Sequence, residues 1–194
     1  MRKLIVVNIV SLDGYFEGPG HDVMALPFDE GFDEYNVERL REAGTLVLGR
    51  NTYLGFKSYW PPVADKPDVR PVEREISRLN NAIEKVVVSD SLTEADLDPW
   101  GDTTRIVRPA VAADQVALLK AEPGKDLLVF GSHTMWNALL VAGVVDEVHL
   151  MIGPAFLGGG TPVFEGSRLP MRLVESRVLA DSQLVLAKYA STLG

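Results

Sequence analysis

Cysteine is absent from the 194-residue chain, and this absence excludes disulfide bonds, thiolate zinc sites and cysteine nucleophiles. Long apolar runs are absent too, because no segment approaches the roughly 20 residues that a transmembrane helix needs. The opening run, "MRKLIVVNIVSLDGYF", is short and has no small-residue cleavage site, so it indicates a first strand and not a signal peptide. We therefore expect a cytoplasmic protein with no membrane partner.

Basic residues are too few to balance the acidic ones. The chain has 19 Lys and Arg against 27 Asp and Glu, which gives a net charge of −8. Such a surface repels nucleic acid, so no nucleic-acid partner is expected, and a phosphate-bearing ligand needs a local cationic pocket. The three histidines, His21, His133 and His149, lack metal-ligand spacing, so no metal site is expected.

Two glycine motifs are also missing. Neither G-x-G-x-x-G nor G-x-x-x-x-G-K-[ST] occurs, which argues against a standard dinucleotide-binding fold and against a P-loop enzyme.

The chain does contain an alternation of apolar strands and amphipathic helices. Runs such as "LLVF" and "KVVVS" lack polar alternation, which suits a parallel sheet covered on both faces. We expect strands at 4–10, 45–48, 85–89, 104–107, 127–131, 146–153, 172–179 and 183–190, and helices near 32–44, from 51, and at 73–82, 114–122 and 134–142. No linker divides the chain, so residues 1–194 are expected to form one α/β domain.

Two junctions between a strand and a helix, "VLGRNTY" and "VFGSHTMWNALL", are candidate ligand sites. In each, a glycine follows the strand and a helix N-terminus comes next, where free N–H groups can bind an anion. Ser132 is placed to cap the second helix. Turning and capping alone also explain each junction taken by itself. Arg50 needs a partner at the mouth of a buried strand, which is either a protein carboxylate or a ligand phosphate.

The order of these segments resembles a known family. "TLVLGRNTY", "KVVVSDSL", "LLVFGSHTMWNALL" and "GPAFLGGGTPVF" follow one another as in the dihydrofolate reductase-like superfamily. The opening "IVVNIVSLDGYF" and the "GGGTPVF" loop resemble its riboflavin-biosynthesis branch, the RibD C-terminal reductase domain. The resemblance implies a three-layer α/β fold with a mostly parallel sheet of about eight strands, an antiparallel C-terminal edge and helices on both faces.

The resemblance also implies that NADPH is the cofactor. Arg50 would face the 2′-phosphate, Thr52 would cap the short helix near the pyrophosphate, and Ser89 would flank the adenosine. Many relatives have a second glycine where this chain has Ser132. The cofactor-binding residues implied in this way are Gly49, Arg50, Asn51, Thr52, Ser89, Gly131, Ser132, His133, Thr134 and Gly159.

On the substrate side, the resemblance implies one carboxylate on the first helix that helps to protonate the substrate. Asp33 fits this role, and Asp29 and Glu30 compete with it. A solvated helix face with N-terminal dipole stabilisation also explains these acids. In the riboflavin branch the first-loop serine and aspartate lie near the substrate, which points to Ser11 and Asp13. A simple turn also explains "LDG". The catalytic candidates are therefore Asp33 and Asp13, and the substrate-binding candidates are Ser11, Asp13 and Asp29.

The resemblance implies an NADPH-dependent reductase that transfers hydride to a C=N or C=O group of a small heterocyclic or ribosylamino-pyrimidine substrate. The reaction would be similar to that of 5-amino-6-(5-phosphoribosylamino)uracil reductase. Dihydrofolate reductase activity is one alternative, although the first-loop tryptophan of those enzymes is missing. A non-catalytic NADPH-binding module is the other. Apolar residues beside the triple glycine, such as Phe156 and Phe164, predict a homodimer.

Overall fold

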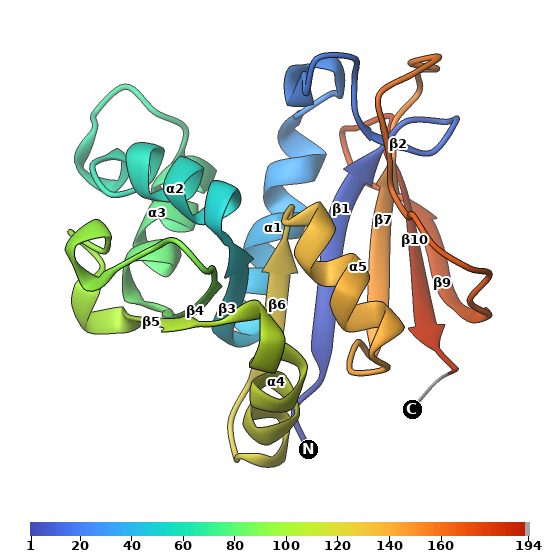
Figure 1. Ribbon diagram of the computed structural model, residues 1–194. Helices are drawn as coiled ribbons and strands as arrows, with labels where there is room; N and C mark the ends of the chain where they lie inside the picture. The colour runs from blue at the N-terminus through green and yellow to red at the C-terminus, as the bar shows by residue number, and fades with distance from the viewer. Residues whose placement is uncertain (193–194) are drawn as a thin grey trace.

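The computed structural model describes residues 1–192, in which one eight-stranded sheet carries helices on both faces (Figure 1). The strand order is β5-β4-β3-β6-β1-β7-β10-β9. Neighbours are parallel from β5 to β7, and β10 and β9 are antiparallel. The strands are β1 (Leu4–Val10), β3 (Ala43–Gly49), β4 (Glu84–Val88), β5 (Thr104–Val107), β6 (Asp126–Phe130), β7 (Glu147–Ile152), β9 (Met171–Val178) and β10 (Val185–Ser191). The expected mostly parallel sheet with an antiparallel C-terminal edge is confirmed.

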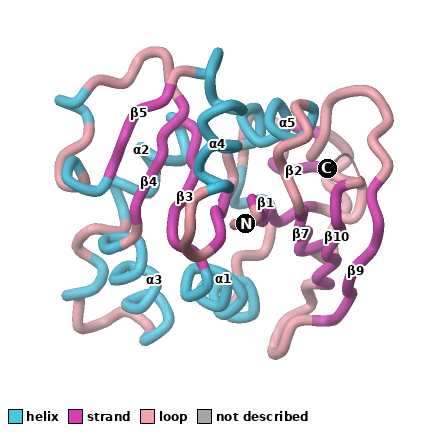
Figure 2. The backbone as a smooth tube through the Cα atoms, turned by 90° about the horizontal axis from the view of Figure 1, so that it is seen from below, coloured by secondary structure: helices cyan, strands magenta, loops and turns pink. Residues whose placement is uncertain are grey.

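The helices form the outer layers. Figure 2 shows α4 and α5 on one side of the strands and α1 and α3 on the other, which confirms the three-layer arrangement. The α-helices are α1 (Glu30–Glu42), α2 (Arg50–Tyr59), α3 (Pro71–Ala82), α4 (Ala112–Ala121) and α5 (His133–Val141). Short 3-10 helices lie at η1 (Val23–Ala25), η2 (Val63–Asp65), η3 (Glu94–Asp96), η4 (Gly101–Thr103) and η5 (Pro109–Val111).

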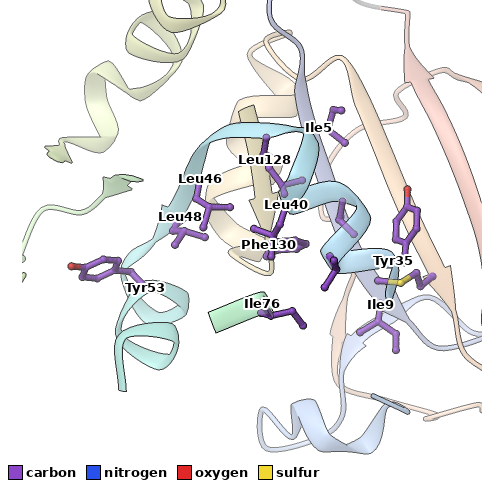
Figure 3. Packing of buried hydrophobic residues seen from close by; sticks show 14 of the residues in the cluster. Ile5, Ile9, Tyr35, Leu40, Leu46, Leu48, Tyr53, Ile76, Leu128 and Phe130 are labelled. Atoms are coloured by element: carbon purple, nitrogen blue, oxygen red, sulfur yellow. The ribbon is translucent and has the colours of Figure 1, made fainter. Parts of the chain in front are cut away.

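Two apolar clusters hold the layers together. One packs Tyr35 and Leu40 of α1 against strand residues such as Leu128 (Figure 3). The other packs α4 and α5, with the buried Trp136, against the opposite face of the sheet. Each fully buried large side chain contributes about 1.5–3 kcal/mol. All seven residues of the central strand β1 are buried, which explains its apolar run without alternation.

Helix α1, which carries Asp33, is fixed at its N-terminus. The Asp29 carboxylate accepts a hydrogen bond from the Phe32 N–H and another from the Ser182 hydroxyl in the β9–β10 turn. A Cβ at Gly31 would lie 2.5 Å from the Cβ of Ser182, so only glycine allows this approach. The first turn of α1 is therefore held against the C-terminal hairpin.

The first loop and the glycine-rich loop are joined, which the sequence analysis did not foresee. Strands β2 (Tyr15–Glu17) and β8 (Thr161–Pro162) pair in a small antiparallel sheet. We call residues 11–25 and 153–166 the joined loops. At Gly160, φ is +123° and an added Cβ would lie 2.0 Å from the Glu17 carbonyl oxygen. Such short strands carry too few residues for an alternating pattern to reveal them.

Candidate cofactor and substrate site

Three neighbouring parallel strands end side by side at the carboxyl edge of the sheet. Gly49 of β3 pairs with Val88 of β4, which pairs in turn with Val107 of β5. The residues that follow them are Arg50, Ser89 and Arg108. Ligands of open α/β sheets bind at this edge, so the register places two arginines on either side of one serine at the expected position.

The two glycine junctions are linked by hydroxyl groups. The Ser132 Oγ accepts a hydrogen bond of 2.9 Å from the Gly49 N–H, and the Thr52 Oγ1 accepts one of 3.0 Å from the Ser132 N–H. These bonds correct two expectations, because neither hydroxyl caps its own helix. The reason is the strand order, which places β6 next to β3. Each hydroxyl here acts as an acceptor, so its own proton is available for donation to a ligand.

Both helix N-termini at these junctions are open to an anion. Within residues 1–192, no side chain forms a capping hydrogen bond at the start of α2 or of α5. Gly131 and Ser132 have φ of +52° and +54°, a left-handed turn in which a Cβ at Gly131 would lie 3.2 Å from the Thr52 Oγ1. Uncapped N–H groups from two adjacent helices fit the two phosphates of a dinucleotide.

Arg50 is exposed at the first position of α2, and its guanidinium donates a 3.2 Å hydrogen bond to the Asn51 side chain. No carboxylate of the described chain lies within ion-pair distance of Arg50. Arg108 is also exposed and donates a 2.8 Å hydrogen bond to the Ser89 carbonyl oxygen. The sequence reasoning missed Arg108, although it follows the predicted strand 104–107 directly.

The Ser89 side chain already forms hydrogen bonds within its own loop. It is buried, and its Oγ accepts hydrogen bonds of 3.1 Å from the N–H groups of Ser91 and Leu92. The hydroxyl therefore shapes the turn after β4. Its predicted position beside the adenosine stays a prediction.

The remaining predicted cofactor residues lie where the joined loops meet α5. The His133 ring stacks on Phe16 of β2 at a centroid distance of 5.4 Å, and Thr134 is exposed in the first turn of α5. A Cβ at Gly159 would lie 3.8 Å from Pro19 of the first loop. The joined loops therefore contact the first turn of α5 through Phe16 and His133, and Thr134 beside them stays exposed.

Asp13 connects the joined loops. Its carboxylate accepts a 2.6 Å hydrogen bond from the Ser11 hydroxyl and bonds of 3.1 and 2.8 Å from the N–H groups of Leu157 and Gly158. The Ser11 hydroxyl, with these N–H groups, lowers the pKa of Asp13 to about 2. A carboxylate held ionised in this way is a poor proton donor. The catalytic and substrate-binding roles of Asp13 and Ser11 stay predictions, and the geometry gives both residues a structural role.

The two acidic candidates on α1 lie in different surroundings. Asp29 caps the helix and bonds to Ser182, so both of its oxygens are engaged. Asp33 is buried and forms an ion pair with Arg70 at the start of α3. Burial raises the pKa of Asp33, and the hydrogen bond and charge of Arg70 oppose that shift. The proton-transfer role of Asp33 stays a prediction, and its partner Arg70 was not predicted from the sequence.

Residues 1–192 contain no group of three His, Asp or Glu side chains placed to hold a metal ion. In the same part of the chain, no helix combines the length and the apolar character needed to cross a membrane.

Fold and site together define an α/β protein of the dihydrofolate reductase-like class. Comparison with family models narrows this class, because the RibD C-terminal domain model matches residues 2–185. The chain belongs to the RibD C-terminal domain family, which confirms the resemblance noted in the sequence.

Individual proteins are similar to this chain in sequence or in fold. The uncharacterised protein YyaP of Bacillus subtilis (strain 168) is 29% identical over 184 residues, which are 93% of this chain and 90% of YyaP. A putative riboflavin biosynthesis protein from Shewanella sp. PV-4 has a similar structure, with a TM-score of 0.70, 25% identity and coverage of 98% of this chain and 99% of that chain. A deaminase/5-amino-6-(5-phosphoribosylamino)uracil reductase from Thermotoga maritima gives a TM-score of 0.63 at 14% identity, over 98% of this chain and 56% of that chain.

Proposed function

We propose that the protein is an NADPH-dependent reductase. The observation that carries the proposal is the pair of linked, uncapped helix N-termini at Gly49 and Ser132, with Arg50 and Arg108 beside them. In a chain of net charge −8, this edge combines free N–H groups with two exposed guanidinium groups. Phosphate groups are the ligands that such donors favour.

Different residues would bind different parts of the cofactor. The N-termini of α2 and α5 would hold the two central phosphates, and the hydroxyls of Thr52 and Ser132 would donate to them. Arg50, with Arg108 on the other side of Ser89, would hold the 2′-phosphate that distinguishes NADPH from NADH. When bound, the nicotinamide supplies the hydride. The protein supplies orientation, cover by the joined loops, and a proton through Asp33.

For the substrate, we propose a small heterocycle of the ribosylamino-pyrimidine type whose C=N or C=O group is reduced. Family membership and the aminouracil reductase named for the Thermotoga maritima relative support this choice. Two alternatives are kept: dihydrofolate as substrate, and a module that binds NADPH without turnover.

The testing experiment is a titration of the purified protein with NADPH and with NADH, read by nicotinamide fluorescence. We expect tight binding with a preference for NADPH, and then NADPH oxidation with 5-amino-6-(5-phosphoribosylamino)uracil. Oxidation with dihydrofolate instead would favour the first alternative. Stoichiometric NADPH binding without turnover on either compound would favour the second. Absence of binding to both nucleotides would contradict the cofactor assignment.

We further propose that the protein acts as a homodimer through its C-terminal hairpin. In the described chain, β9 pairs with β10 alone and leaves its other edge open. Four apolar side chains are 39–64% exposed on this hairpin: Leu173, Val174, Val178 and Val185. An apolar groove of about 480 Å³ continues from the hairpin at Met171 and Tyr189 toward Trp136 of α5. A second copy of the chain would bury this continuous surface, which is of the kind that monomers rarely expose.

The dimer predicts a large effect of one charge on β9. Val174→Arg places a cation on the proposed interface, and we expect the dimer dissociation constant to rise at least tenfold, as for interface residues worth about 2 kcal/mol. Sedimentation velocity across a concentration series measures the change. Val111→Arg is the matched control, because Val111 is 45% exposed in η5 beside the far edge of the sheet. A wild-type protein that stays monomeric at all concentrations contradicts the dimer.

A further inference from the structure

Asp33 and Arg70 form a charged contact between two helices. Asp33 lies in the first turn of α1 with its side chain 13% exposed, and Arg70 is the N-cap residue of α3 with its side chain 47% exposed. Arg70 donates from Nη2 to the Asp33 Oδ2. Arg70 is thus half exposed to solvent, while the Asp33 carboxyl is largely buried.

Arg70 is held by a second carboxylate as well. Its Nε and its backbone N–H both lie 3.1 Å from the Glu73 Oε2, and the Tyr59 hydroxyl donates to the Glu73 Oε1 at 3.3 Å. The Nη2 contact with Asp33 and the Nε contact with Glu73 use different nitrogens. Rotation about the last torsions of the Arg70 side chain can therefore break the first contact while α3 stays in place.

We propose that Arg70 is a positioning residue that keeps Asp33 ionised in the free protein and has to release it before Asp33 can transfer a proton. This inference rests on the proposed reductase function, because it concerns the proton that accompanies the hydride. A carboxylate paired with a guanidinium has no proton to donate. Release of Arg70 leaves a buried carboxylate without its counter-ion, and burial then favours the neutral acid.

The charged groups around Asp33 determine whether its pKa rises or falls when Arg70 leaves. Arg70 and Glu73 face it from α3, Tyr59 lies near it from α2, and Asp29 lies at the N-cap of its own helix. Arg70 is the only cation in this set, so its withdrawal leaves acidic neighbours alone. Both carboxylates and the burial of Asp33 raise its pKa.

The proton balance is simple. When Arg70 leaves, Asp33 takes one proton from solvent and forms an O–H bond. That bond would break as the proton passes to the nitrogen or oxygen of the C=N or C=O group, and bound NADPH would supply the hydride to its carbon. An anionic group on the substrate, such as a phosphate, would attract the Arg70 guanidinium away from Asp33.

The first test measures the ion pair without any substrate. The Asp33 carboxyl is titrated by carbon NMR in protein labelled with ¹³C-aspartate, with Asp33→Asn to assign the signal. We expect Arg70→Met to raise the pKa of Asp33 by roughly 1–3 units, the range for loss of an adjacent opposite charge, and Arg70→Lys to restore part of the difference. Arg74→Met is the matched control, because Arg74 of the same helix bonds to the carbonyl oxygens of Lys66 and Pro67. An unchanged pKa in Arg70→Met and Arg70→Lys overturns the inference.

The second test uses the pH profile of NADPH oxidation with 5-amino-6-(5-phosphoribosylamino)uracil. We expect the alkaline limb of kcat/KM, which reports the free protein, to move upward in Arg70→Met by the same 1–3 units, while the limb of kcat stays in place because Arg70 has already left Asp33 in the substrate complex. We also expect a higher KM for the phosphorylated substrate. A uniform loss of kcat/KM at every pH, with its limb unmoved, means a merely structural role and overturns the inference. Absence of activity in the wild-type protein contradicts the proposed function, whereas the NMR titration decides the ion pair by itself.

Discussion

Replacement of Arg50 by alanine is expected to weaken NADPH binding about 10- to 100-fold and to leave NADH binding unchanged. A hydrogen bond to a charged group is worth roughly 1.5–3 kcal/mol, and each 1.4 kcal/mol is tenfold in affinity. The whole effect falls on NADPH because only NADPH carries the 2′-phosphate. Fluorescence titration with both nucleotides measures the difference.

The surroundings of Arg50 make this expectation specific. Its guanidinium is exposed and bonds to Asn51 alone among the described side chains. Most of its N–H donors are therefore not used by the protein itself. Binding of 2′,5′-ADP and 5′-AMP repeats the test without the nicotinamide. Arg105→Ala is the control, since Arg105 is an exposed arginine of β5 that precedes the carboxyl edge. Equal losses for NADPH and NADH would remove Arg50 from the 2′-phosphate site.

Gly160→Ala is expected to lower the free energy of unfolding by about 3 kcal/mol or more. Steric strain of a left-handed residue costs roughly 1–2 kcal/mol, and the new Cβ would lie 2.0 Å from the Glu17 carbonyl oxygen, which is backbone and cannot rotate away. At roughly 2–4 °C for each kcal/mol in a chain of this size, the melting temperature falls by about 6–12 °C. Thermal unfolding followed by circular dichroism measures it.

The same substitution at a neighbouring glycine provides the control. Gly158 also has a positive φ, +68°, but no heavy atom lies within 4 Å of an added Cβ. Gly158→Ala should therefore cost only the strain, about 1–2 kcal/mol. If the two variants melt at the same temperature, the close approach of the joined loops is wrong. Because Phe16 of the joined loops stacks on His133 in the first turn of α5, we also expect weaker NADPH binding in Gly160→Ala.

Much of the fold follows from local sequence. Apolar runs predicted each strand of the main sheet, and their lack of alternation predicted a parallel sheet covered on both faces. The glycine junctions at Gly49 and Gly131 marked the carboxyl edge of the sheet. These features depend on residues within a few positions of one another, so periodicity and turn propensity reveal them.

Side-chain partners could not be predicted in this way. Thr52 was expected to cap its own helix, and it binds the Ser132 N–H, 80 positions away. Asp33 was expected on a solvated helix face or in the site, and it pairs with Arg70, 37 positions away. Asp13 was expected near the substrate, and it accepts the N–H of Leu157, 144 positions away.

The amino-acid sequence by itself determined the succession of strands and helices, the apolar core and membership of the RibD C-terminal domain family. Tertiary structure alone decided which groups are free to bind a ligand and which are already engaged by the protein. The physical reason is that a hydrogen bond or ion pair satisfies a polar group wherever its partner comes from. Those partners are brought together by the strand order, which places β3 between β4 and β6. Arg50, at the end of β3, keeps guanidinium N–H groups that are free to bind a ligand.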